Sequence, residues 1–117
     1  MHYQVAPNQE AKLVRCTSGA IYDVIIDLRP DSPTYTQWIA VELNEDNRKM
    51  LFIPKDFAHG FLTLTDNTEI FYQMTQYFVA EASRGLRWND TTIKIDWPEP
   101  ISSISPKDKN YPDFQPE

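Results

Sequence analysis

The chain has 117 residues, enough for one domain whose hydrophobic core needs no disulfide. Eleven basic and 17 acidic residues give a net charge of −6, so neither nucleic acid nor an anionic membrane is an expected partner. A single cysteine, Cys16, excludes an intramolecular disulfide and suits a reducing compartment. The sequence has no apolar run of the roughly 18 residues that a membrane span needs, and no signal peptide at its start. We therefore expect a cytoplasmic protein.

The apolar pattern along the chain is that of β-strands. From Ala20 to Leu28, alternate residues are apolar on one face, while Asp23 and Asp27 fall on the other. Turn-forming residues separate this segment from four further predicted strands, at 38–43, 50–53, 60–64 and 69–78. Such spacing, with a possible helical turn only near 81–84, predicts an all-β sandwich or barrel.

The tail from Pro98 to Glu117 contains five of the nine prolines and many charges. Composition alone favours a disordered end for this segment. No repeat or internal linker divides the rest of the chain, so residues 1–117 are expected to form one domain.

Transition-metal ligands are scarce. The chain has two histidines and one cysteine, whereas a zinc or iron site usually takes three or four protein ligands. No His-x-His or Cys-x-x-Cys spacing occurs. We therefore expect no metal.

His59 stands in the most informative internal stretch, residues 53–61. A turn that contains Pro54 delivers this histidine at the start of a predicted strand, and Gly60 leaves its surroundings open. His59 could therefore face the interior of a barrel and bind a ligand. An ordinary core or surface histidine is an equally good interpretation of this stretch alone.

Tyr72, Met74 and Phe78 share one face of the predicted strand at 69–78, so they can line a barrel together. Core packing is the simpler explanation of this pattern, although a tyrosine hydroxyl in a wet cavity can also act as a proton donor. Lys12 shares a face with Val14 and Cys16, which directs a cation toward the core. Because an unpaired buried cation is costly, Lys12 is expected to have a partner or a ligand.

A set of short motifs occurs in one order along essentially the whole chain. Together they resemble the dTDP-4-dehydrorhamnose 3,5-epimerase family. The motifs are His2-Tyr3-Gln4, Lys12-Leu13-Val14-Arg15, Ser32-Pro33-Thr34, Ile53-Pro54 with Phe57-Ala58-His59-Gly60-Phe61, Phe71-Tyr72, Trp88-Asn89-Asp90 and Ser105-Pro106-Lys107-Asp108. The resemblance implies a cupin-like double-stranded β-helix, or jelly-roll barrel. It also implies a homodimer that works without a metal or other cofactor.

The reaction of that family is the removal and return of protons at the two carbons beside a ketone. The resemblance implies conversion of dTDP-4-dehydro-6-deoxyglucose, a dTDP-linked 4-keto-6-deoxy sugar, to dTDP-4-dehydrorhamnose by epimerisation at C3 and C5. This step belongs to dTDP-rhamnose and cell-surface polysaccharide biosynthesis. By the same resemblance, His2 is the base, Asp108 orients its imidazole, and Tyr72 is the acid across the sugar ring. A histidine suits such a shuttle because its pKa lies near neutrality.

The resemblance also assigns substrate contacts. Lys12 corresponds to a cation near the developing oxyanion, where fixed charge contributes most. His59 and Lys107 correspond to ligand-contacting residues, and Phe78 to an aromatic that stacks on the thymine. Because Asp108 lies in the tail, this assignment requires the tail to fold back onto the barrel.

The family normally has about 60 residues before the position of His2, so the sequence is expected to be an N-terminally truncated epimerase domain. Two alternatives remain open at this point. One is a non-catalytic cupin that binds a sugar nucleotide, and the other is a related 3-epimerase or keto-isomerase. A base and an acid on opposite sides of one cavity would distinguish an enzyme from a binding module.

Overall fold

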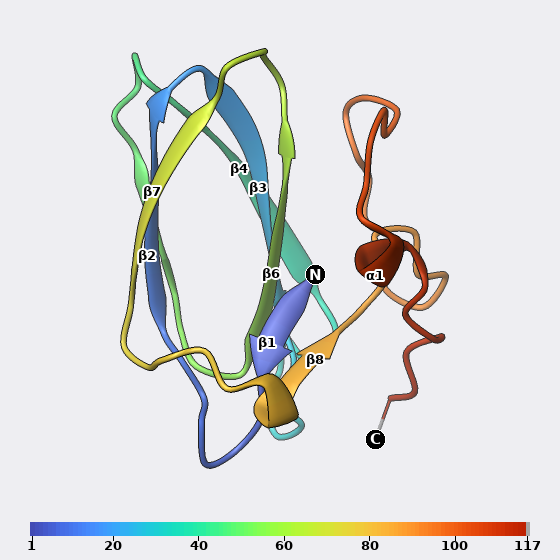
Figure 1. The fold of residues 1–117 in the computed structure, drawn as a ribbon. Helices are drawn as coiled ribbons and strands as arrows, with labels where there is room; N and C mark the ends of the chain where they lie inside the picture. The colour runs from blue at the N-terminus through green and yellow to red at the C-terminus, as the bar shows by residue number, and fades with distance from the viewer. Residues whose placement is uncertain (117) are drawn as a thin grey trace.

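The computed structural model describes residues 1–116, which form eight strands, one 3-10 turn and one short helix (Figure 1). All strand pairs are antiparallel. The all-β prediction is therefore confirmed. The elements are β1 (His2–Gln4), β2 (Lys12–Ser18), β3 (Ala20–Asp27), β4 (Trp38–Asn44), β5 (Met50–Ile53), β6 (Phe57–Thr63), β7 (Glu69–Met74), η1 (Ala80–Ala82), β8 (Ser83–Gly85) and α1 (Pro106–Lys109).

The strands form two sheets that face each other. One has five strands in the order β4-β3-β6-β1-β8, and the other has three in the order β5-β2-β7. In Figure 1 the three-stranded sheet stands on the left, and β3, β4 and β6 stand opposite it. None of the helices in residues 1–116 is long and apolar enough to cross a membrane.

Strand β3 is the centre of the fold because both of its faces are buried. Ile21 and Ile25 point between the two sheets, into a core shared with Val14 and Leu43. Val24 and Ile26 point the other way, into a second core shared with Ala58, Leu86 and Ile93. The alternation expected for residues 20–28 is present. Both faces are interior, however, so Asp23 and Asp27 are 0% and 2% exposed.

The C-terminal segment covers the second core. Figure 1 shows this segment, in orange to red, outside the barrel on the side of the five-stranded sheet. Trp97 Nε1 donates to the carbonyl of Trp88 at 2.9 Å, and the Phe114 amide donates to the Asp90 carboxylate at 2.8 Å. Apolar burial and these bonds order a segment whose composition favours disorder. The fold-back that the family resemblance requires is therefore present.

The structure differs from the sequence expectations at several local points. The strand expected at 69–78 ends at Met74, because its partner β2 begins at Lys12 and the Thr75 amide then bonds to the Ala11 carbonyl. The helical turn expected near 81–84 is the 3-10 turn at 80–82, and Ser83 and Arg84 already pair with β1. Helix α1 was not predicted because four residues show no periodicity.

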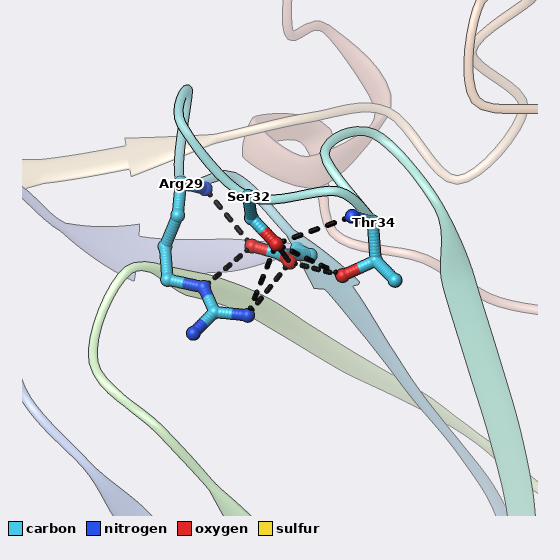
Figure 2. Close-up of polar contacts among 4 residues, drawn as sticks. Arg29, Ser32 and Thr34 are labelled. Atoms are coloured by element: carbon cyan, nitrogen blue, oxygen red, sulfur yellow. Dashed lines mark hydrogen bonds and ion pairs between the residues drawn. The ribbon is translucent and has the colours of Figure 1, made fainter.

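The loop after β3 is held by one buried carboxylate, that of Asp27. Arg29 donates to both of its oxygens, at 2.9 and 2.8 Å, and the hydroxyls of Ser32 and Thr34 donate at 2.6 and 2.5 Å. Figure 2 shows these three side chains converging on the carboxylate. The hydrogen bonds from Arg29 above all, with those from Ser32 and Thr34, hold the pKa of Asp27 far below its usual 3.8 against the opposing effect of burial.

Replacing Asp27 with Asn is expected to lower the free energy of unfolding by about 1 to 3 kcal/mol, because buried donors lose an ionised acceptor. Urea titration of both proteins measures this difference. The folded pKa of Asp27 is depressed, so its contribution is present above pH 4 and is lost as the pH falls below 3.8. The difference in the free energy of unfolding between the parent chain and Asp27→Asn should therefore become smaller in acid. Asp31→Asn, an exposed change in the same loop, should alter stability little. An equal loss in both variants would contradict the role of Asp27.

Candidate active site

A cavity of about 710 Å³ opens between the two sheets and the C-terminal segment. Residues from β1 and β6 line one wall, residues from β2 and β7 line the other, and residues 101–108 contribute a further part. Every site residue predicted from the sequence lines this cavity. They are His2, Lys12, His59, Tyr72, Phe78, Lys107 and Asp108.

His2 and Asp108 form a hydrogen-bonded pair although 106 residues separate them. His2 Nε2 lies 2.5 Å from Asp108 Oδ1. Strand β1 places the histidine on the cavity side of the sheet. The Ser105 hydroxyl caps helix α1 by accepting from the Asp108 amide at 3.2 Å, and this contact fixes the start of the helix that carries the carboxylate. The spatial pairing that the family resemblance implies is present in the fold.

The charge balance of this pair favours a neutral imidazole at neutral pH. Burial lowers the pKa of His2 below 6.5, and the Asp108 hydrogen bond and charge oppose that effect only in part. Burial raises the pKa of Asp108, but the His2 hydrogen bond and charge outweigh it and leave the pKa below 3.8. A carboxylate only accepts hydrogen bonds, so Nε2 carries the proton and Nδ1 keeps a free lone pair. Nδ1 is then the atom that can remove a proton.

His59 lies next to His2 across the β1–β6 ladder. Its Nε2 lies 2.5 Å from Asp23 Oδ1, and the Asp23 side chain has no exposed surface. His59 is therefore held by a buried carboxylate at the cavity wall, and its side chain is 10% exposed. Sequence analysis missed Asp23 as a member of the site. Its only sequence signal is a carboxylate in the apolar strand β3, and nothing local shows that His59 is its partner.

Tyr72 and Met74 stand on the opposite wall, on the inner face of β7, and Phe78 follows in the loop beyond the strand. These side chains are 56%, 40% and 66% exposed, so the core-packing explanation is wrong. They line the cavity but leave it open to solvent. Tyr72 pairs with Val14 of β2, whose side chain belongs to the core between the two sheets.

The two lysines differ in their surroundings. The Lys12 side chain is 13% exposed and lies 3.3 Å from the carboxylate of Glu10, so the inward cation has the partner that its position predicts. Lys107 is exposed, beside Asp108 in α1, and its charge lowers the pKa of His2 slightly. The cavity thus holds a histidine–carboxylate pair, a phenol on the opposite sheet, and two lysines.

Comparison with known proteins gives one family. Residues 1–116 match the model of the dTDP-4-dehydrorhamnose 3,5-epimerase family. The epimerase of that name from Escherichia coli K12 is 47% identical over 110 residues, which cover 93% of this chain and 60% of that protein. The chain spans about 60% of the length of most of the curated relatives that it matches.

Solved structures agree with this result. The structure of dTDP-4-dehydrorhamnose 3,5-epimerase from Bacillus anthracis, with TDP and PPi bound, superposes with a TM-score of 0.93 at 43% identity, over 97% of this chain and 65% of that one. An epimerase from Legionella pneumophila in complex with dTDP-4-keto-L-rhamnose gives 0.86 at 38% identity, over 92% of this chain and 57% of that one. The cupin-like jelly-roll fold is thereby confirmed. On sequence and structure together, this chain belongs to the dTDP-4-dehydrorhamnose 3,5-epimerase family.

Proposed function

We propose that this chain epimerises C3 and C5 of a dTDP-linked 4-keto-6-deoxy sugar, converting dTDP-4-dehydro-6-deoxyglucose to dTDP-4-dehydrorhamnose. The observation that supports it most is the placement of the His2–Asp108 pair and of Tyr72 on different sheets of one cavity. A binding module has no need of a base and an acid across one space. The relatives that carry the epimerase name, and the Legionella structure with its dTDP-keto-sugar, support the choice of substrate class.

The proposed chemistry follows from the positions of the side chains. His2 Nδ1 removes the proton from the carbon beside the ketone, and the electrons of the C–H bond move to the C4 oxygen as an enolate. Lys12 stabilises the negative oxygen, and this stabilisation is largest in a site with little water. Tyr72 then donates its phenolic proton to the opposite face of the same carbon, so the configuration inverts. His2 then releases its proton to solvent and Tyr72 regains one from solvent, and the same steps repeat at the second carbon.

The remaining cavity residues are assigned to substrate binding. We assign Phe78 to stacking on the thymine, and His59 and Lys107 to polar contacts with the sugar nucleotide. Within residues 1–116, no group of three or more His, Cys, Asp or Glu side chains could hold a metal ion. The proposed proton transfer uses no metal or other cofactor, as the family resemblance implies.

The experiment that tests the function is solvent exchange. The protein is incubated in D₂O with dTDP-4-dehydro-6-deoxyglucose, and proton NMR follows the signals at C3 and C5. Loss of both signals with formation of dTDP-4-dehydrorhamnose is the expected result. Exchange at C3 alone would identify a 3-epimerase, and binding without exchange would identify a sugar-nucleotide binding protein. Either outcome would overturn the proposal.

We also propose a homodimer. Paired residues of β2, β5 and β7 place Met50, Phe52 and Phe71 on the outer face of the three-stranded sheet, where they are 50%, 61% and 53% exposed. Adjacent exposed apolar side chains of this size are typical of interaction surfaces. Sedimentation equilibrium of the chain and of Phe52→Lys tests the proposal. The variant should dissociate at lower dilution than the parent chain, and a parent chain that is monomeric throughout would contradict it.

The last parts of the proposal concern organisation and location. We infer that residues 1–117 act as one domain, since both cores share β3. We place the protein in the cytoplasm, where the buried free thiol of Cys16 would stay reduced.

A further inference from the structure

Tyr111 packs against the His2–Asp108 pair from the C-terminal segment. Its ring centroid lies 6.1 Å from that of His2, and the two planes meet at 67° in an edge-type contact. Tyr111 follows Asp108 by three residues, just beyond helix α1. The same short segment therefore supplies both the carboxylate that bonds to His2 and the ring that packs beside it.

Gly85 makes this contact possible. Gly85 is the residue of β8 that pairs with His2, so the two positions share one face of the sheet. A Cβ atom at Gly85 would lie 2.2 Å from Cζ of Tyr111 and 2.4 Å from its Cε2. Non-bonded carbon atoms do not approach within 3.0 Å of each other in folded proteins. The phenol ring of Tyr111 therefore fits against β8 only because residue 85 has no side chain. The ring occupies the place that a side chain beside His2 would take.

The tyrosine hydroxyl is not what holds the ring in place. It is buried and has no hydrogen-bond partner in the described part of the chain. Burial first, and then the Asp108 charge, raise the pKa of Tyr111, so the phenol stays neutral at physiological pH. Tyr111 is therefore held by the packing of its ring, and not by charge or by a hydrogen bond of its hydroxyl.

We propose that Tyr111, seated on Gly85, is a positioning residue that holds the Asp108 carboxylate and the His2 imidazole in register. The contact places a rigid ring between α1, which carries Asp108, and β8, which pairs with the strand of His2, and so fixes the distance between them. Without the ring, a space opens beside His2. The imidazole can then rotate into this space, and α1 can move toward β8. The inference refines the proposed catalytic base, but its main test does not depend on activity.

The test is the NMR signal of the His2 Nε2 proton, assigned by its loss in Asp108→Asn. A proton held in a short bond to a carboxylate gives a downfield resonance. Because the His2 side chain is 47% exposed, the signal is recorded at low temperature, where exchange with water is slower. We expect the signal to persist in Tyr111→Phe, which keeps the ring. We expect it to broaden beyond detection in Tyr111→Ala and in Gly85→Ala, whose added methyl displaces the ring.

Arg87→Ala is the matched control for general docking of the tail. Arg87 forms an ion pair with Asp113, two residues from Tyr111. This variant should keep the signal. Loss of the signal in Arg87→Ala, its survival in Tyr111→Ala, or its loss in Tyr111→Phe would each overturn the inference. Near-UV circular dichroism identifies any variant that has lost its tertiary structure, and the decision then rests on Gly85→Ala and Tyr111→Phe.

Solvent exchange into the substrate gives a second readout. Tyr111→Ala should lower the maximum rate of deuterium incorporation by about 10- to 100-fold with little change in KM, because misplacement by an ångström affects the reacting geometry more than binding. If the parent chain shows no exchange but the NMR result holds, the proposed function fails and the positioning role stands. If the parent chain shows exchange but the NMR signal does not depend on Tyr111, the proposed function stands and the positioning role fails.

Discussion

Replacing His2 with Ala is expected to lower the rate of deuterium incorporation into the keto-sugar by about 100- to 10,000-fold, the range of general base contributions. The physical reason is that Nδ1 of His2 is the proposed proton acceptor, and no other histidine occupies its place. His59 lies beside it, but its Nε2 is bonded to the buried Asp23 carboxylate. Substrate binding, measured by calorimetry, should change far less than the rate.

His59→Asn is the control for this prediction, because it changes the other histidine of the same cavity. Its proposed role is binding, so it should raise KM more than it lowers the maximum rate. A loss of rate in His59→Asn equal to that in His2→Ala would contradict the assignment of His2 as the base.

The pH profile of the parent chain provides a further check on His2. Its neutral form is the active form, and its pKa lies below 6.5. The exchange rate should therefore be level near pH 7 and fall tenfold per pH unit only below the lowered pKa. The Asp108 carboxylate raises the pKa of His2, so Asp108→Asn should move this acid limb to still lower pH. A shift of the limb to higher pH would contradict the pairing.

Tyr72→Phe is expected to separate two signals that the parent chain produces together. The change removes the proposed proton donor and leaves the base, so inversion should fall by about 100- to 10,000-fold while exchange at the substrate carbons falls much less. The Phe ring fits where the Tyr ring stood, so the cavity keeps its shape. Product formation is measured by chromatography, and exchange is measured by NMR in D₂O.

Tyr77→Phe is the matched control for the tyrosine. Tyr77 is 86% exposed and is not among the residues that line the cavity, although it lies five residues further along the chain. Both signals should stay at the parent level in this variant. Equal, mild losses of both signals in Tyr72→Phe would mean that this tyrosine only shapes the cavity, and the acid would have to be sought elsewhere.

Much of the β-structure could be predicted from the sequence because strand periodicity is local. The alternation in residues 20–28 predicted β3 almost to its last residue, and the apolar run at 50–53 gave the bounds of β5. The predicted end of a strand was wrong where the strand stops because its pairing partner stops. Strand β7 stops at Met74 since β2 begins at Lys12, and the pattern of residues 75–78 carries no trace of that limit.

For the candidate site, too, some features could be predicted from local sequence and others depend on tertiary packing. Ordered short motifs pointed to His2, Tyr72 and Asp108, and an inward lysine pointed to a partner for Lys12. Composition suggested that the tail was disordered. The tail is ordered because aromatic side chains near residues 97 and 114 bury themselves against the second core, and no local property of the tail describes that surface.

The all-β class, the central strands and the kinds of side chain available for proton transfer follow from local patterns and residue chemistry, so they can be predicted without a structure. Which side chains meet cannot, because contacts depend on the packing of distant segments. Asp108 reaches His2 across 106 residues, Asp23 lies against His59, and Tyr111 is seated on Gly85. Each of these contacts depends on how the sheets pair and on how the last segment packs against them. Those pairings are set by the burial of two cores that the whole chain shares, and no stretch of sequence contains them.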